Sequence, residues 1–316
     1  MMDWFLLAVG LVALYFGAEW LVRGASRLAA ALGVSPLAIG LTVVGFGTSM
    51  PEVVVSVLAA WRGEPAIALG NVVGSNIANT GLILATAALI SPLKTNLSLL
   101  RREGPIMIGV TLAVWAVGYT GVFARWTGAV MLALLVVFVV MSLRWARTEP
   151  QEIADEFAKF EKETRLVGGT MAGDVGWILA GLATLVAGGQ ALVTSAVEIA
   201  RRFDVPEAVI AATLVAVGTS LPELATSVVA ALRREADISV GNIIGSNMFN
   251  LLGVLGLSAA VRPIPVSPDV LRYEMVWMVG FALATVVVLR TGHRISRVEG
   301  ALLLAAYVVF VVTLFL

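Results

Sequence analysis

The sequence contains no cysteine and a single histidine, and only 13% of its 316 residues are charged. The absence of cysteine excludes a disulfide scaffold, and the low charge excludes a water-soluble domain, in which about a quarter of residues are charged. The formal net charge is zero, so there is no basic face for nucleic acid. Hydrophobic residues make up 59% of the chain, and the mean hydropathy is +0.96. The composition therefore predicts a polytopic protein of the lipid bilayer, and nothing in it indicates an obligate protein partner.

Long apolar runs cover most of the chain. A bilayer core needs about 20 apolar residues per helix, and charge clusters and Gly/Pro pairs separate ten such runs. We therefore expect an all-α membrane protein with ten transmembrane helices. The first run is too long and lacks the basic start of a signal peptide. The predicted spans are 4–32, 36–61, 66–91, 104–120, 126–146, 173–200, 207–232, 238–261, 271–290 and 298–316.

The spans divide into two five-helix halves, 1–146 and 173–316, joined by a hydrophilic loop at 147–172. The loop is mixed in charge and too short to form a domain. With ten spans, 15 of the 21 Lys and Arg residues fall in the loops on one side of the membrane. Basic loops face the cytoplasm, so we expect both termini outside and a location in the cell (inner) membrane.

The chain is duplicated internally. A shift of 171 residues aligns 38–92 with 209–263 without a gap, and 24 of these 55 positions are identical. GFGTSMPE at 45–52 matches AVGTSLPE at 216–223, and GNVVGSNIAN at 70–79 matches GNIIGSNMFN at 241–250. Because each half holds an odd number of spans, the two repeats must be inverted relative to each other. Inverted repeats are typical of secondary transporters that bind substrate near the bilayer midplane.

Two carboxylates, Glu52 and Glu223, occupy equivalent positions within otherwise apolar spans. An intramembrane carboxylate is costly and usually functional. A single one could snorkel to the interface or form a structural hydrogen bond, but a symmetric pair in the same polar string favours an ion site. Glu19 differs, because its repeat equivalent is Gln190 and Arg23 follows four residues later, which favours an ion pair.

The string Gly-Thr-Ser-x-Pro-Glu brings further oxygens to each glutamate. The threonine lies on the same helix face as the glutamate, and the serine lies about 100° away. Proline has no N–H, so the glycine carbonyl four residues earlier loses its helical partner and can face a cation. These residues are Gly47, Thr48, Ser49 and Pro51, and Gly218, Thr219, Ser220 and Pro222.

The following span of each half carries polar residues at every fourth position. They are Asn71, Ser75 and Asn79 in the first half and Asn242, Ser246 and Asn250 in the second. Small-residue packing with interhelical hydrogen bonds explains the neighbouring glycines and the amides of Asn71 and Asn76. Ser75, Asn79, Ser246 and Asn250 are the better candidates for cation ligands.

The candidate site contains only oxygen ligands, without thiolate or imidazole. Such a donor set favours hard cations, Ca²⁺ or Na⁺, as transported ions, and it implies no cofactor. The one histidine, His293, lies in a basic loop and is expected to be inert. Two carboxylates neutralise one Ca²⁺ or two Na⁺, so the two ions would compete for the same place. A third Na⁺ would make the exchange electrogenic.

The two GTSxPE strings and their GN..GSN..N partners resemble the alpha repeats of the sodium/calcium exchanger family of cation/calcium antiporters. The resemblance covers the whole chain and implies four clustered cation sites between spans 2, 3, 7 and 8, with spans 1 and 6 sliding to alternate access. It implies carbonyl ligands from Gly45 and Ala216. The side-chain ligands that it implies are Thr48, Ser49, Glu52, Ser75 and Asn79, with Thr219, Ser220, Glu223, Ser246 and Asn250.

The sequence departs from part of this family at Asn250, where several members carry aspartate. Asparagine there argues against potassium coupling, and the short 147–172 loop leaves no room for regulatory domains. The intact Thr-Ser pairs favour sodium over the alternative, a Ca²⁺/H⁺ antiporter on the same site. An intramembrane enzyme would need a nucleophile–histidine constellation, which is missing, and a passive channel would not bind ions so tightly.

Overall fold

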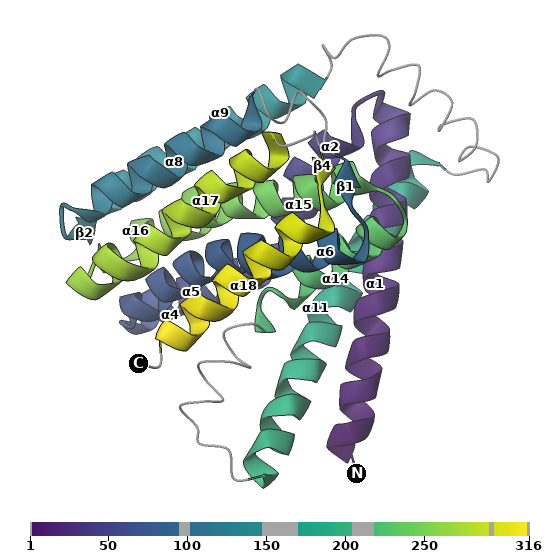
Figure 1. The fold of residues 1–316 in the computed structure, drawn as a ribbon, viewed down its shortest axis with the longest axis horizontal. Helices are drawn as coiled ribbons and strands as arrows, with labels where there is room; N and C mark the ends of the chain where they lie inside the picture. Colours follow the sequence, from purple (N-terminus) through teal and green to yellow (C-terminus); the bar gives the residue numbers. More distant parts are fainter. Residues whose placement is uncertain (1, 95–101, 147–169, 204–217, 291–293, 315–316) are drawn as a thin grey trace.

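The computed structural model describes residues 2–94, 102–146, 170–203, 218–290 and 294–314, and within them the chain is almost entirely helical (Figure 1). The first-half helices are α1 (Met2–Leu32), α2 (Pro36–Ile39), α3 (Gly45–Thr48), α4 (Met50–Arg62), α5 (Pro65–Ala78), α6 (Ala85–Ile90), α8 (Glu103–Gly118) and α9 (Arg125–Ala146). The second-half helices are α11 (Met171–Arg202), α14 (Leu221–Leu232), α15 (Ala236–Met248), α16 (Leu255–Val261), α17 (Met275–Arg290) and α18 (Arg297–Thr313).

Four segments of the described chain are π-helical and continue into α-helices without a turn. They are η1 (Gly40–Val44), η2 (Asn79–Leu84), η4 (Phe249–Val254) and η5 (Val270–Glu274). Each predicted span thus corresponds to one helix or to a run of helices, except that the first part of the seventh, 207–217, lies outside the described residues.

Six helices in the described part of the chain are long and apolar enough to cross a membrane, and the bent pair 36–62 would be a seventh. Two others, α8 and α14, are apolar but shorter. The protein is therefore a polytopic helical membrane protein, while the count of ten spans stays a prediction.

The two longest helices, α1 and α11, run side by side at a steep angle to the rest of the bundle (Figure 1). Glycines allow this close contact: a Cβ added at Gly17 would lie 2.9 Å from the backbone nitrogen of Leu185, and one added at Gly181 would lie 2.6 Å from that of Leu21. An ion pair between Asp3 and Arg202 joins their ends. The two helices therefore form one paired unit.

The centre of the bundle is formed by the runs α5–η2–α6 and α15–η4–α16. In their most apolar windows 72% and 83% of residues are buried, against 28% in α9 and α11. Spans that are surrounded by protein can carry polar residues that lipid-facing spans cannot. These central runs are the ones that hold the GN..GSN..N strings.

Two short antiparallel β-ladders join the halves of the chain. β1 (Leu93–Lys94) pairs with β4 (Arg294–Ile295), and β2 (Val122–Phe123) pairs with β3 (Ile264–Pro265). Each ladder thus takes one strand from each half. The pairing holds connections that lie more than 140 residues apart in sequence against each other at the edge of the bundle.

Glu19 on α1 forms ion pairs with two arginines. Arg23, one turn later, lies 2.8 Å away, and Arg233 at the end of α14 contacts both carboxylate oxygens. The predicted ion pair is therefore confirmed, and the arginine of the other half was not predicted. In the adjoining turn, burial raises the pKa of the Glu235 carboxyl. The Ser26 hydroxyl on α1 and the charge of Arg233 partly offset this increase.

We expect Glu19→Gln to lower the stability of the folded protein by about 1–3 kcal/mol, because it removes a charge-assisted contact between α1 and α14. Thermal unfolding in detergent measures the change. The control is Arg23→Gln, whose side chain is 55% exposed and should contribute less than about 1 kcal/mol. Equal effects of the two substitutions would contradict a role for Glu19 in joining the helices.

Candidate cation site

Each half carries its glutamate just after a break in a helix. Ser49 has non-helical backbone angles (φ −79°, ψ 4°) and separates α3 from α4, which are bent by 44°. Ser220 has nearly the same angles (φ −88°, ψ 6°) and precedes α14. Both prolines, Pro51 and Pro222, follow in the first turn, where a missing N–H costs nothing. The prolines therefore produce the predicted interruption, and it occurs at the serines rather than at the glycines before them.

The two glutamates are linked across the halves by these serines. Ser49 Oγ donates to Glu223 Oε1 at 3.1 Å, and Ser220 Oγ donates to Glu52 Oε1 at 3.2 Å. Both carboxylates are fully buried, with 0% exposure. The remaining oxygen of each, Oε2, accepts no hydrogen bond within the described part of the chain. A buried oxygen with free lone pairs is suited to a cation.

Hydroxyl groups of neighbouring helices complete this centre. Thr48 Oγ1 lies 3.3 Å from Ser246 Oγ, whose hydroxyl also lies 3.4 Å from the Gly45 carbonyl oxygen. On the other side of the centre, Ser220 Oγ lies 3.4 Å from Ser75 Oγ. The predicted serines of the two central runs, Ser75 and Ser246, are thus within contact distance of residues at the helix breaks of the opposite half.

The candidate amides, Asn79 and Asn250, lie in the π-helical turns η2 and η4. Asn79 Nδ2 donates to Asn247 Oδ1 at 3.1 Å, while its own Oδ1 has no hydrogen bond among the described residues. Neither polar atom of Asn250 has a partner there, although the residue is 0% exposed. π-Helical turns are frequent at functional sites. No local residue pattern in the sequence indicates a π-helical turn at these positions, so the turns were not predicted.

Two residues that the sequence analysis assigned to packing or left unassigned contact the site directly. Asn71 Oδ1 accepts from Thr219 Oγ1 at 3.3 Å, and Asn242 Oδ1 accepts from Thr48 Oγ1 at 3.0 Å. Both asparagines belong to the duplicated GN strings, and that duplication was the signal that could have identified them.

Some predicted residues cannot be placed. Ala216 and His293 lie outside the described residues. No group of three or more His, Asp or Glu side chains occurs in the described ranges, so the two glutamates are accompanied there by neutral oxygens. The donor set is that of a hard cation, with a formal charge of −2 from two carboxylates.

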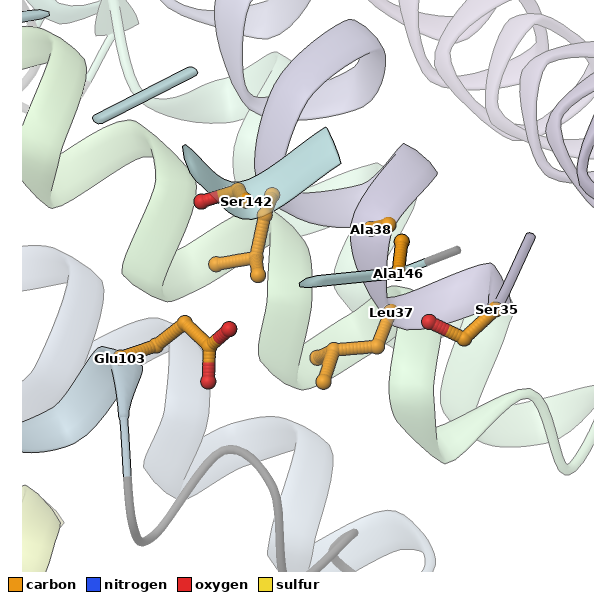
Figure 2. Close-up of a pocket in the computed structure, with 7 residues that line it drawn as sticks. Ser35, Leu37, Ala38, Glu103, Ser142 and Ala146 are labelled. Atoms are coloured by element: carbon orange, nitrogen blue, oxygen red, sulfur yellow. The ribbon is translucent and has the colours of Figure 1, made fainter. Parts of the chain in front are cut away.

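A separate shallow depression, too narrow to enclose a water molecule, lies between α2, α8 and α9 (Figure 2). Figure 2 shows the Glu103 carboxylate from the start of α8 and the Ser142 hydroxyl from α9 on its wall, near Leu37 and Ser35. None of the predicted cation ligands lines it. It is therefore distinct from the Glu52–Glu223 centre.

Several relatives match nearly the full length of the chain. The putative antiporter CaxA of Alkalimonas amylolytica is 39% identical over 313 residues, with 97% of each chain covered. The sodium/calcium exchanger MaX1 of Methanosarcina acetivorans is 34% identical over 345 residues, covering 99% of this chain and 98% of that protein.

Among solved structures, the sodium-calcium exchanger NCX_Mj, soaked with zero Na⁺ and Ca²⁺, superposes with a TM-score of 0.86 at 29% identity, covering 99% of this chain and 98% of that one. The family profile described as "Sodium/calcium exchanger protein" matches residues 2–144 and 174–316, so it covers both halves. The chain is thus a membrane transport protein rather than an enzyme, and it belongs to the sodium/calcium exchanger family.

Proposed function

We propose that this protein exchanges Na⁺ for Ca²⁺ across the cell membrane, and that both ions bind at the Glu52–Glu223 centre. The observation that carries the proposal is the reciprocal pairing of the carboxylates, each held through one oxygen by a serine of the other half. The second oxygen of each is buried and has no hydrogen bond among the described residues. Two such oxygens supply the charge that one Ca²⁺ or two Na⁺ require.

The proposed ligands are the oxygens that surround these carboxylates. From the first half they are the Gly45 carbonyl, Thr48, Ser49, Glu52, Ser75 and Asn79. From the second half they are the Ala216 carbonyl, Thr219, Ser220, Glu223, Ser246 and Asn250. A third Na⁺ held by the neutral members of this set would leave a positive site and make transport electrogenic.

Alternating access would follow from two inverted five-helix repeats. The paired helices α1 and α11 pack mainly on each other and share an apolar cluster with α2 and α14, whereas most buried apolar residues of the central runs, though not Ile238, belong to a second cluster. In the proposed cycle, the α1–α11 pair slides across the central helices and opens the site to one side at a time. The central runs and the broken helices that carry the two glutamates, which together hold the proposed ligands, stay in place.

The test is radiolabelled Ca²⁺ uptake into proteoliposomes with either an imposed Na⁺ gradient or an imposed pH gradient, all other ions being equal. Uptake driven by the Na⁺ gradient supports the proposal. Uptake driven only by the pH gradient would replace it with Ca²⁺/H⁺ antiport on the same carboxylates. No coupled uptake under either condition would contradict antiport of calcium.

Asn250→Asp is expected to change the Na⁺ or H⁺ dependence of exchange several-fold while changing the half-saturating Ca²⁺ concentration less than about twofold. The reason is that the new carboxylate adds a titratable charge beside a centre that already neutralises Ca²⁺. Initial rates at varied Na⁺ and pH measure the change. If neither dependence moves, Asn250 is a packing residue and not a ligand.

A further inference from the structure

The amide of Asn242 has a defined orientation. Its Nδ2 donates to the Ser227 hydroxyl at 2.9 Å and lies 3.3 Å from the Glu223 carbonyl oxygen, both on α14. A backbone carbonyl only accepts hydrogen bonds, so this contact places Nδ2 on the α14 side. The amide oxygen therefore faces the other way, toward Thr48 Oγ1 at 3.0 Å.

This orientation decides which atom is the donor at Thr48. An amide oxygen cannot donate, so in this contact the Thr48 hydroxyl is the donor and the amide oxygen the acceptor. The competing acceptors are two carbonyls of its own helix, that of Val44 at 3.1 Å and that of Gly45 at 3.4 Å. When Asn242 takes the proton, the lone pairs of Thr48 remain available to other groups, and Ser246 Oγ lies 3.3 Å away.

The first half repeats this arrangement. Asn71 Nδ2 donates to Ser56 Oγ at 2.9 Å and lies 3.4 Å from the Glu52 carbonyl oxygen, both on α4. Its Oδ1 accepts from Thr219 Oγ1 at 3.3 Å. Each asparagine thus binds the glutamate-bearing helix of its own half and the threonine of the opposite half. No other side chains described here make this double connection.

We propose that Asn71 and Asn242 are positioning residues that hold the hydroxyls of Thr219 and Thr48 with their lone pairs available to the transported cation. This inference rests on the proposed function of the Glu52–Glu223 centre. Without the amide of Asn242, the Thr48 hydroxyl returns its proton to a carbonyl of its own helix and its lone pairs turn away from the site. The asparagines do not touch the ion and act only through the threonines.

Double-mutant cycles on equilibrium ⁴⁵Ca²⁺ binding to the purified protein test this inference. Asn242→Ala and Thr48→Val are each expected to raise the Kd about tenfold, and the double variant should bind no more than twofold more weakly than Thr48→Val alone. Asn242→Ala combined with Thr219→Val is the cross control, whose two effects should multiply. If the Asn242 and Thr48 effects also multiply, the proposal is wrong.

A matched control for the loss of a buried amide is Asn76→Ala. Asn76 lies on α5 and donates only to the Val72 carbonyl of its own helix, so its loss should change the Kd less than twofold. An increase as large as that of Asn242→Ala would show that any amide loss weakens binding, and would overturn the proposal.

If Asn242→Ala does not fold, the same double-mutant cycle is measured on the equivalent pair of the other half, Asn71 and Thr219. Asn71→Ala with Thr219→Val must then show the same non-additivity, and Asn71 is only partly buried. Failure of both alanine variants to fold would overturn the proposal, because the amides would then be structural. Wild-type Ca²⁺ binding without Na⁺-driven uptake would contradict the proposed function but not the positioning role.

Discussion

Glu52→Gln is expected to reduce Ca²⁺ exchange at least about 100-fold while the protein remains folded. The carboxylate is one of only two that meet in the centre of the described bundle, and it is fully buried. Glutamine keeps the size of the side chain and an acceptor for Ser220, but removes the charge. A divalent cation would then face a single carboxylate in a region of low dielectric, where the loss of one charge costs several kcal/mol.

Uptake of ⁴⁵Ca²⁺ into proteoliposomes under a Na⁺ gradient measures this effect, and size-exclusion chromatography establishes folding. Glu223→Gln should give the same loss, because the two carboxylates have reciprocal contacts. The control is Glu64→Gln, an exposed residue in the turn that follows α4, which should exchange at the wild-type rate. Near-native exchange by either Glu52→Gln or Glu223→Gln would show that the cation binds elsewhere.

Gly245→Val is expected to prevent the protein from folding or to lower its unfolding temperature by at least about 10 °C. A Cβ at Gly245 would lie 2.8 Å from the carbonyl carbon of Leu41 and 2.9 Å from its Cα, and closer still to its carbonyl oxygen. These are backbone atoms of η1, so the clash cannot be relieved by a rotamer change. Overpacking of this kind costs about 1–3 kcal/mol for a small group and more for a branched one.

Thermal unfolding followed by size-exclusion chromatography measures the loss. Gly280→Ala on α17 is the control, because a Cβ there would meet no atom within 4 Å. A folded Gly245→Val variant with an unchanged unfolding temperature would contradict the close packing of α15 against η1. This packing matters for the site because the two elements come from opposite halves. α15 carries the proposed ligand Ser246, and η1 directly precedes the proposed ligand Gly45.

The positions of the helices could be predicted well from hydrophobic runs. The span expected at 126–146 is α9 (Arg125–Ala146), and the one expected at 4–32 is α1 (Met2–Leu32). Apolar length determines these bounds, because a helix in lipid must satisfy its own backbone. The π-helical turns at Asn79 and Phe249 were missed, because they depend on how neighbouring helices pack and have no local sequence pattern.

The pair of glutamates could be predicted because the sequence is duplicated. Each carboxylate alone is ambiguous, whereas two at equivalent positions indicate a shared role. The interpretation of Asn71 as a packing residue was incomplete. Its spacing predicted an interhelical contact, but its partner, Thr219, lies 148 residues away and no periodicity within one helix can identify it.

The sequence by itself determined the membrane location, the helical spans, the duplicated halves and the residue types of the site, since all of these depend on local composition or on comparison of the chain with itself. Only the tertiary structure decided that each glutamate receives its hydrogen bond from the serine of the other half and that each asparagine orients the opposite threonine. The physical reason is that a hydrogen bond forms between atoms about 3 Å apart in space. These partners are 148 to 194 residues apart in sequence, and only the packing of the two halves brings them to that distance.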